Sequence, residues 1–290
     1  MKQLCNSCPR QCNAQRTDND NIGGFCGMPM LPKIARADLH FWEEPCISGT
    51  NGSGTIFFSG CSMRCVYCQN YEISHKNKGK VISVEELAEI IKELELKGAH
   101  NINFVNPTHY MEAVKAALKI YRPRIPLVCN TGGYELTENI EQNIFDIYLF
   151  DLKYISSEKS LRYSAVADYF ERASAALKAA YKLKTQCVFN KDGIMQSGII
   201  VRHLLLPAAT NEAINIIDWF FQNTPNAFFS LMAQYVPCGR AEQYKEINRK
   251  ITKREYDKVL QHLITKNSDR IYIQDSVSSD KKYIPDFDLF

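Results

Sequence analysis

Three cysteines in one short stretch are the residues of this chain whose spacing most clearly points to chemistry. Cys61, Cys65 and Cys68 follow a C-x3-C-x2-C pattern, so one tight loop supplies three thiolates. A closed tetrahedral zinc site or an ordinary four-iron cluster needs four ligands. The loop therefore predicts an iron–sulfur cluster with one iron left open to a small molecule. The alternatives are a zinc knuckle that borrows a distant fourth ligand, or buried thiols without a metal.

A second group of cysteines lies near the N-terminus. Cys5, Cys8 and Cys12 are followed, after thirteen residues, by Cys26. These four thiolates would complete a structural zinc site or a second, closed iron–sulfur cluster. The stretch 18–24 between them is polar and contains glycine, so it has too few apolar residues to fold around a core of its own. A metal would hold this segment together, and unligated thiols are the third interpretation.

Composition narrows the class of protein. A chain of 290 residues with 45% hydrophobic and 23% charged residues can form one sizeable domain with an appended segment. Its net charge of +3 is too small to indicate nucleic acid or an anionic membrane as a partner. No apolar run approaches the roughly 18 residues that span a bilayer, and the first residues show no signal peptide. We therefore expect a cytoplasmic protein, in which clustered cysteines indicate metal ligation rather than disulfides.

Alternating strands and helices must position the cysteine loop. Ser83 and Glu86 form a capping box that starts a helix, and Gly98 stands where that helix should end. The other predicted helices span 111–121, 137–143, 169–183, 211–221 and 252–266. The predicted strands span 55–59, 101–106, 126–130, 146–151, 199–206, 227–235 and 270–274. This alternation predicts right-handed crossovers and a parallel sheet.

The number of repeats favours an open rather than a closed barrel. About six strand–helix units are too few for eight-fold closure, so we expect an α/β fold with a partial, TIM-like (β/α)6 barrel. Loops after the carboxyl ends of the strands would build the site, and the cysteine loop follows one such end. Residues 186–195 predict a small hairpin before the fifth strand. The expected organisation is a cysteine-rich segment over 1–50, the barrel over 51–275 and a tail over 276–290.

Several phrases of the sequence support a resemblance to a known family. They are CNSCPRQC at 5–12, WEEPCISG at 42–49, GSGTIFF at 52–58, NINFVNPTHY at 101–110, DIYLFDLKY at 146–154, VRHLLLP at 201–207 and MAQY at 232–235. Together with the cysteine loop they resemble the radical S-adenosylmethionine (SAM) enzymes. Within that superfamily the chain resembles the proteins similar to pyruvate formate-lyase activating enzyme, and most closely the PflX-type branch.

The resemblance implies a cofactor and a reaction. In these enzymes the open iron of a 4Fe-4S cluster binds the amino and carboxylate groups of SAM. One electron then cleaves the sulfonium, giving methionine and a 5'-deoxyadenosyl radical that abstracts hydrogen. Tyr67, directly before the last cysteine of the loop, stands where the family places a residue beside the adenine. The implied partners are a glycyl radical enzyme and an electron donor of the flavodoxin or ferredoxin type.

The resemblance also places cofactor contacts at the ends of the next strands. Asn106 and Thr108 stand where the family carries a Gly-Gly-Glu stretch that receives the SAM amino group. Asn130 replaces an aspartate of the activating enzymes, which removes a charge that would serve a monovalent cation. Asp151 and Lys153 match the Asp-Leu-Lys of the family and alternate to the same face of their strand. Without that match, such a pair reads as an exposed salt bridge.

The last two strands add further candidates. Arg202 and His203 are neighbours on the fifth strand, so one of the two should point into the site. Gln234 ends the sixth strand. The full set of predicted cofactor-contacting residues is Tyr67, Asn106, Thr108, Asn130, Asp151, Lys153, Arg202, His203 and Gln234.

Three functions remain open at this point. The leading hypothesis is an enzyme that cleaves SAM and activates a glycyl radical enzyme. A second is a radical SAM enzyme of another reaction class, acting on a small molecule or a peptide. A third is a non-catalytic metal-binding redox or scaffold protein, against which the polar strand ends at Asp151 and Lys153 argue.

Overall fold

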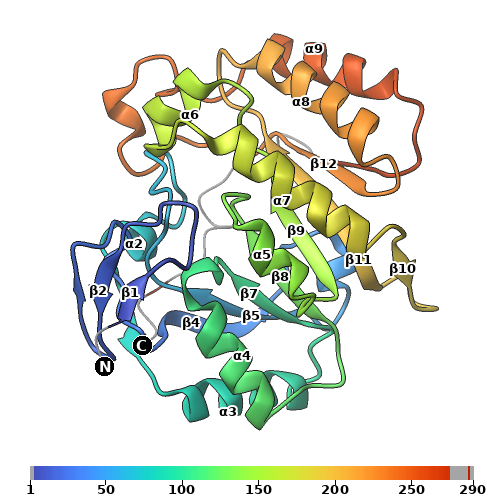
Figure 1. Ribbon diagram of the computed structural model, residues 1–290. Helices are drawn as coiled ribbons and strands as arrows, with labels where there is room; N and C mark the ends of the chain where they lie inside the picture. Colours follow the sequence, from blue (N-terminus) through green and yellow to red (C-terminus); the bar gives the residue numbers. More distant parts are fainter. Residues whose placement is uncertain (1–2, 275–286, 288–290) are drawn as a thin grey trace.

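A mostly parallel sheet forms the centre of the molecule. The computed structural model describes residues 3–274 and Phe287 of the chain (Figure 1). The large sheet has the strand order β13-β12-β11-β9-β8-β7-β5-β4-β6, with β10 paired to β11. Its parallel strands are β5 (Ser53–Phe58), β7 (Ile102–Val105), β8 (Leu127–Thr131), β9 (Ile147–Asp151), β11 (Met195–Leu204), β12 (Phe228–Met232) and β13 (Ile271–Gln274). The predicted α/β partial barrel is therefore confirmed.

The helices lie where the sequence predicts them. They are α3 (Val84–Leu96), α4 (Met111–Ile120), α5 (Thr137–Glu141), α7 (Tyr169–Leu183), α8 (Thr210–Asn223) and α9 (Lys253–Ile264). The capping box of α3 is formed, because the Ser83 hydroxyl accepts from the Glu86 amide and the Glu86 carboxylate accepts from the Ser83 amide. Helix α6 (Ser157–Ser164) was not predicted, because its polar sequence has no continuous apolar face. The four-residue helices α1 (Pro45–Ser48) and α2 (Tyr71–Ser74) were not predicted either, because one turn is too short for a periodic signal.

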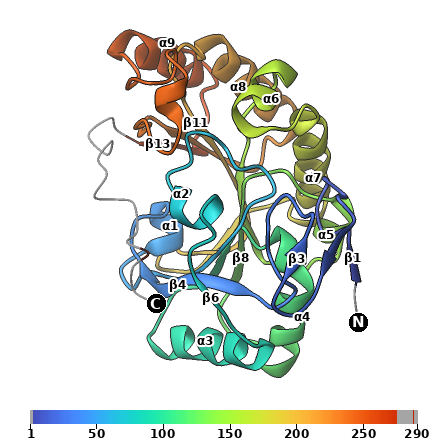
Figure 2. The same cartoon turned by 90° about the vertical axis from the view of Figure 1, so that its left-hand side faces the viewer.

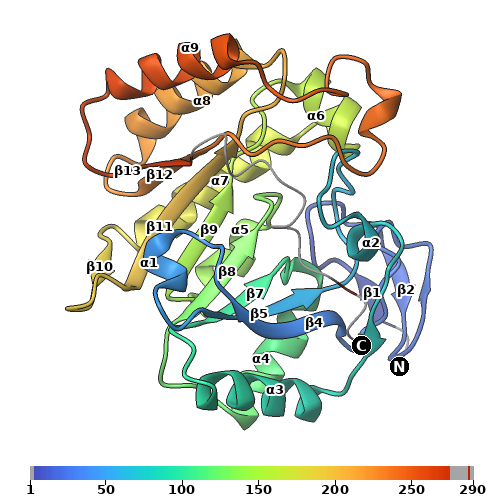
Figure 3. The ribbon, with the colours of Figure 1, turned by 180° about the vertical axis from the view of Figure 1, so that it is seen from behind.

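The two faces of the large sheet are covered differently. Helices α4, α5 and α7 cover one face, where inward residues such as Phe104 and Phe150 are fully buried (Figure 1). On the other face lies the short helix α1 (Pro45–Ser48), which stands in front of the strands in the view from behind (Figure 3). Cys46 and Ile47 of α1 pack against aliphatic residues of β8, β9 and β11. This packing fills one end of the concave face and leaves the other end open.

Beside the aliphatic residues that α1 covers, the concave face carries polar residues. Side chains alternate along a strand, so Arg202 of β11 points to this face together with its register partners Asp151 of β9 and Ser230 of β12. These three are buried or nearly so. These polar residues lie toward the carboxyl ends of the strands, which is where a barrel of this type places its site.

Short antiparallel strands complete the sheet and were not predicted. β4 (Lys33–His40) and β6 (Lys80–Val81) lie at the edge next to β5. β4 falls within the 1–50 segment of the sequence but belongs to the large sheet. The predicted hairpin over 186–195 is formed by β10 (Val188–Phe189) and the start of β11.

A separate three-stranded sheet forms the amino-terminal part. It consists of β1 (Gln3–Cys5), β2 (Ala14–Arg16) and β3 (Asn21–Ile22). This sheet lies beside α5, where the Asn139 amide donates to the Ser7 backbone oxygen over 3.1 Å (Figure 2). We call residues 3–28, which contain this sheet, the N-terminal module.

Two further observations complete the fold. The predicted tail, 276–290, lies outside the described residues except for Phe287, whose ring packs edge-on against Phe57. Among the helices of the described residues, none combines the length and the apolar character that crossing a membrane requires.

Candidate functional site

A cavity of about 410 Å³ lies at the carboxyl ends of the parallel strands. Most of the predicted site residues line it. They are Cys61, Cys65, Tyr67, Cys68, Asn106, Asn130, Asp151, Lys153, Arg202 and Gln234. The fold thus brings together residues that are up to 173 positions apart in sequence, from Cys61 to Gln234. Thr108 and His203 do not line this cavity.

The cysteine loop is fixed by its backbone. Gly60 has φ +78°, and a Cβ atom there would overlap the side chain of Met28. The Val66 amide donates to the Tyr163 backbone oxygen over 2.8 Å, and the Arg240 amide donates to the Val66 backbone oxygen over 2.7 Å. Segments from three distant parts of the chain therefore hold the loop in place.

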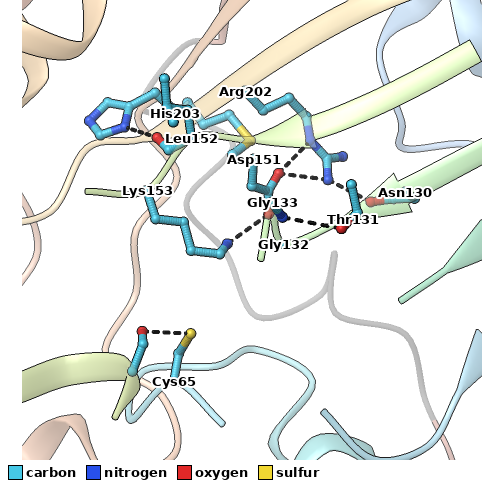
Figure 4. Close-up of polar contacts among 12 residues, drawn as sticks. Cys65, Asn130, Thr131, Gly132, Gly133, Asp151, Leu152, Lys153, Arg202 and His203 are labelled. Atoms are coloured by element: carbon cyan, nitrogen blue, oxygen red, sulfur yellow. Dashed lines mark hydrogen bonds and ion pairs between the residues drawn. The ribbon is translucent and has the colours of Figure 1, made fainter. Parts of the chain in front are cut away.

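The sulfur atoms of the loop receive hydrogen bonds. The Met63 amide donates to Cys61 Sγ over 3.4 Å, and the Ser164 hydroxyl of α6 donates to Cys65 Sγ over 2.9 Å (Figure 4). Burial raises the pKa of Cys65 to about 11, although the Lys153 cation lowers it. Burial also raises the pKa of the Cys68 thiol, to about 12. Raised pKa values favour the protonated thiols of Cys65 and Cys68, so a metal that binds these two residues must displace their protons.

An ion-paired network forms the floor of the cavity (Figure 4). Arg202 donates from Nε to Asp151 Oδ1 over 2.9 Å, from Nη1 to Glu43 Oε2 over 3.0 Å and from Nη2 to Asn130 Oδ1 over 2.7 Å. Lys153 Nζ donates to Asp151 Oδ2 over 2.7 Å. Burial acts to raise the pKa of Asp151, but the cations of Arg202 and Lys153 outweigh it and lower that pKa. Asp151 and Lys153 are therefore a salt bridge that also faces the cavity.

Arg202 and His203 point to opposite faces of β11. Arg202 faces the cavity, whereas His203 Nδ1 donates to the Leu152 backbone oxygen over 2.8 Å on the far side (Figure 4). His203 lines a smaller cavity of about 170 Å³ beside Glu212. Burial lowers the pKa of His203 to about 4, so the ring is neutral at pH 7. The prediction of His203 as a contact of the main cavity is not met, because strand alternation gives that face to Arg202.

Tyr67 and Asn106 connect the loop with its surroundings. The Tyr67 hydroxyl is hydrogen-bonded to the Tyr154 hydroxyl over 2.5 Å, and its ring is almost completely buried. Asn106 adopts φ +58° at the end of β7, and its Nδ2 donates to the Gly60 backbone oxygen over 2.7 Å. An asparagine tolerates this left-handed backbone better than most residues do. Asn106 thus ties the second strand end to the start of the cysteine loop.

Thr108 lies away from the cavity, contrary to its prediction as a cofactor contact. It begins the 3-10 turn η1 (Thr108–Tyr110), and its hydroxyl donates to the Glu135 carboxylate. Thr131 of β8 donates to the same Glu135 oxygen, so the Thr108 side chain is bound on the far side of the β7 and β8 ends from the cavity floor. Burial raises the pKa of Glu135 to about 7, although the hydroxyls of Thr108 and Thr131 lower it.

The four N-terminal cysteines are neighbours in space. Cys5, Cys8 and Cys26 are buried, while Cys12 is exposed. Burial raises the pKa of Cys8 to about 12, and the nearby thiols of Cys26 and Cys5 add to the rise. Arg16 lies at the same place, and its Nη1 donates to Cys5 Sγ over 3.5 Å. Within the described residues, no three Cys, His, Asp or Glu side chains converge on the position of one metal ion.

Sequence reasoning missed two acidic residues of the site, Glu43 and Glu44. Both line the cavity, because α1 folds into the concave face and carries the preceding residues with it. A signal was present in the sequence, since two adjacent carboxylates stand directly before Pro45, a residue suited to the first turn of a helix. What the sequence did not reveal is where that helix packs.

Comparisons with known proteins agree with this architecture. A family model described as the Radical SAM superfamily matches residues 55–195. The uncharacterised protein MJ0674 of Methanocaldococcus jannaschii is 30% identical over 280 residues, which cover 92% of this chain and 76% of that protein.

Two solved structures are similar at low identity. Streptococcus suis SuiB, in a structure bound to S-adenosylmethionine, is 14% identical with a TM-score of 0.48, over 74% of this chain and 48% of its own. The FeFe-hydrogenase maturase HydG of Carboxydothermus hydrogenoformans is 14% identical with a TM-score of 0.46, over 78% of this chain and 54% of its own. The present chain thus spans about half the length of these two proteins.

Proposed function

This chain belongs to the Radical SAM superfamily, and we propose that it cleaves SAM reductively and abstracts hydrogen from the backbone glycine of a glycyl radical enzyme. The superfamily implies a 4Fe-4S cluster and SAM as cofactors. When bound, the cluster supplies the electron that cleaves SAM into methionine and a 5'-deoxyadenosyl radical. The observation that carries the proposal is one cavity lined by all three loop cysteines and by the ion-paired floor.

The three cysteine sulfurs of the loop are suitable ligands for such a cluster. Cys61, Cys65 and Cys68 offer three sulfurs on one side of the cavity, and amide and hydroxyl donors reach two of these sulfurs. Hydrogen bonds of this kind stabilise thiolates bound to iron and tune the reduction potential. In a cluster each thiolate binds a different iron atom, so the thiols need a wider spacing than ligands of a single ion.

The floor of the cavity suits the amino-acid part of SAM. Lys153 Nζ has three donors and uses one on Asp151, which leaves donors for a carboxylate. Asp151 has both carboxylate oxygens engaged, so it acts mainly by holding Lys153 and Arg202 in place. Asn106, Asn130 and Gln234 add neutral amides around the same cavity. We assign to these residues the binding and orientation of SAM.

The proposed partners follow from the proposed reaction on a backbone glycine. A reaction on a glycine backbone needs a peptide loop to enter the cavity at the open ends of the strands. The partner would be a glycyl radical enzyme, and electrons would come from a flavodoxin- or ferredoxin-type donor. A small molecule or a different peptide is the alternative substrate.

Two measurements test the proposal. Anaerobic protein reconstituted with iron and sulfide, then reduced with dithionite, should convert SAM to 5'-deoxyadenosine, which chromatography detects. Co-incubation with a glycyl radical enzyme should produce a stable carbon-centred radical in its EPR spectrum. Bound iron without 5'-deoxyadenosine would favour a scaffold role. Cleavage of SAM without the carbon radical would favour a radical enzyme of another reaction class.

We also propose that Cys5, Cys8, Cys12 and Cys26 hold a second metal centre, either zinc or an iron–sulfur cluster. The buried guanidinium of Arg16 supports this proposal. It donates to Cys5 Sγ and to the backbone oxygens of His109 and Pro29, and among the described residues no carboxylate forms an ion pair with it. Four thiolates on a metal would provide the negative charge that such a buried cation needs.

A further inference from the structure

Glu44 is a buried carboxyl group without a hydrogen-bonding partner. Its residue is 1% exposed, and neither carboxylate oxygen has a partner among the described residues. Arg202 Nη1 lies 4.0 Å from Glu44 Oε2, too far for a hydrogen bond. The Ser230 hydroxyl is near enough to lower the pKa of Glu44, but no well-formed hydrogen bond joins the two. Buried carboxylates are rarely left in this state without a reason.

The charges of the cavity floor balance without Glu44. Arg202 directs its donors to Asp151, Glu43 and Asn130, and Lys153 donates to Asp151. Two cations therefore match the two carboxylates of Asp151 and Glu43, and Glu44 is a surplus acid. Burial raises its pKa, even though the Arg202 cation lowers it. The free protein thus buries one negative charge more than it compensates, or keeps Glu44 protonated.

The cavity that Glu44 lines contains a further acceptor without a partner among the described residues. Gln274 Oε1 also lines the cavity and has no partner among the described residues. The carboxylate of Glu44 and the amide oxygen of Gln274, which line one cavity, are acceptors that a cation with several N–H donors would satisfy.

Glu44 lies in the part of the cavity that is remote from the cysteine loop. The groups that shift its pKa are Arg202, Glu43 and Ser230, which belong to β11, the segment before α1 and β12. The charged groups that influence Cys65 are instead Lys153 and Asp151. In the sheet β12 is separated from β5, which leads into the cysteine loop, by β11, β9, β8 and β7. A group bound at Glu44 would therefore lie on the substrate side of the cavity.

We propose that Glu44 binds a cationic group of the substrate, of which a primary ammonium is the most compact example. This inference rests on the proposed function, because it identifies the chemistry of the substrate of that same site. The positive charge would complete the charge balance of the floor, and its N–H groups would satisfy Glu44 and Gln274. Such a contact selects an amine-bearing small molecule or a basic side chain of a peptide over neutral or acidic substrates.

Simple probes of equal length test this proposal. We would add n-butylammonium chloride, butan-1-ol or sodium butanoate to reconstituted, SAM-bound protein in an amine-free buffer, at matched ionic strength. Affinity would come from the rise of Tm with probe concentration. Because a charge-assisted hydrogen bond is lost with the charge, we expect n-butylammonium to bind at least about ten-fold more tightly than butan-1-ol. Butanoate should not bind.

Variants separate substrate binding from a structural role. Glu44→Gln should reduce n-butylammonium binding to the level of butan-1-ol, leave SAM affinity within about two-fold and leave the Tm of the probe-free protein equal or higher. Glu85→Gln, on the exposed surface of α3, is the matched control and should change none of these values. A fall in Tm of several degrees for probe-free Glu44→Gln would instead show that Glu44 is a structural partner of Arg202.

Other outcomes also overturn the inference. Equal binding of n-butylammonium and butan-1-ol by the wild-type protein would do so without any variant. A ten-fold loss of SAM affinity in Glu44→Gln, with the ammonium probe unaffected, would make Glu44 a cofactor contact. The proposed function fails separately, if wild-type protein forms no 5'-deoxyadenosine. When 5'-deoxyadenosine forms but the probes are not distinguished, only the inference about Glu44 fails.

Discussion

The two cysteine groups of this chain are held in place by different means. The loop of Cys61, Cys65 and Cys68 is fixed by backbone hydrogen bonds to the barrel, such as the one from the Val66 amide to the Tyr163 oxygen. The loop is therefore part of the barrel, and its cysteines are free to serve chemistry.

The N-terminal module is held by long cationic side chains, in addition to Cys26 and Met28 at its end, which join the barrel core. Arg10 donates to the Ala165 backbone oxygen over 2.9 Å and stacks on Phe25, with its guanidinium carbon 3.4 Å from the ring centre. Arg64 donates to the Cys26 backbone oxygen over 3.1 Å. Such contacts give the module less stability than a packed core would. The difference predicts that changes in the loop affect catalysis, whereas changes in the module affect metal content and stability.

The largest effect should come from the loop. Cys65→Ala removes one of three cluster ligands, so we expect 5'-deoxyadenosine formation to fall below detection while Tm stays within a few degrees of the wild-type value. Anaerobic chromatography and circular dichroism would measure the two quantities. Cys187→Ala, outside both cysteine groups, is the control and should retain activity. Retained SAM cleavage in Cys65→Ala would remove the distinction between the two groups.

The opposite result is expected for the module. Cys26→Ser should release the second metal and lower Tm by about 5 °C or more, because metal binding supplies folding energy to a segment without a core. Metal analysis of the triple alanine variant of the loop identifies that metal. Iron that remains indicates a second cluster, and zinc indicates a structural knuckle. An unchanged Tm and no remaining metal would mean that the N-terminal thiols are unligated.

Arg16→Met also tests whether the N-terminal cysteines bind a metal, since it removes a buried cation at nearly constant side-chain size. If the neighbouring thiols are bound to a metal as thiolates, the change breaks a buried charge pair as well as the hydrogen bonds to the His109 and Pro29 backbone oxygens, and it should lower the free energy of unfolding by about 3 kcal/mol. Urea denaturation would measure it, with the exposed Arg124→Met as control. A variant as stable as the wild-type protein would indicate neutral thiols and no metal.

The barrel was more predictable from sequence than the module or the edge of the sheet. Buried parallel strands such as β9 (Ile147–Asp151) are continuous apolar runs, which the sequence shows directly. By contrast β4 (Lys33–His40) is mostly half-buried and mixes charged with apolar residues, so no period stood out. The strands of the module have only two or three residues each, too few for any periodic signal.

The site was predictable where a single strand decides it. Asp151 ends β9 and Lys153 follows two residues later, so period-two alternation continued past the strand end was enough to pair them. The same rule could not tell which of Arg202 and His203 faces the cavity, because that depends on the orientation of the whole strand. Glu44 was missed because its position is set by the packing of α1 against strands more than 75 residues away, beginning with Val128.

Glu135 lies near Cys8 of the N-terminal module, and it makes the stability of the protein depend on pH. Its pKa is raised to about 7, so the folded state keeps a proton that the unfolded state releases above about pH 4.5. Stability should therefore fall as pH rises from about 4.5 to 7, by up to about 3 kcal/mol, and Glu135→Gln should remove this loss. Denaturation at pH 5 and pH 8 would measure it, with the exposed Glu138→Gln as control. A Glu135→Gln protein less stable than wild type at pH 8 would contradict the assignment.

The smallest effect should come from Ser164, which belongs to the barrel but acts on the cluster. Its hydroxyl donates to Cys65 Sγ, and a hydrogen bond to a ligand sulfur favours the reduced, more negative cluster. Losing about 1 kcal/mol in Ser164→Ala lowers the reduction potential by on the order of 40 mV and slows SAM cleavage a few-fold. EPR-monitored redox titration would show it. Ser160→Ala, on the same helix, bonds only a backbone oxygen and should leave the potential unchanged. Equal potentials in both variants would mean that α6 supports the loop by packing alone.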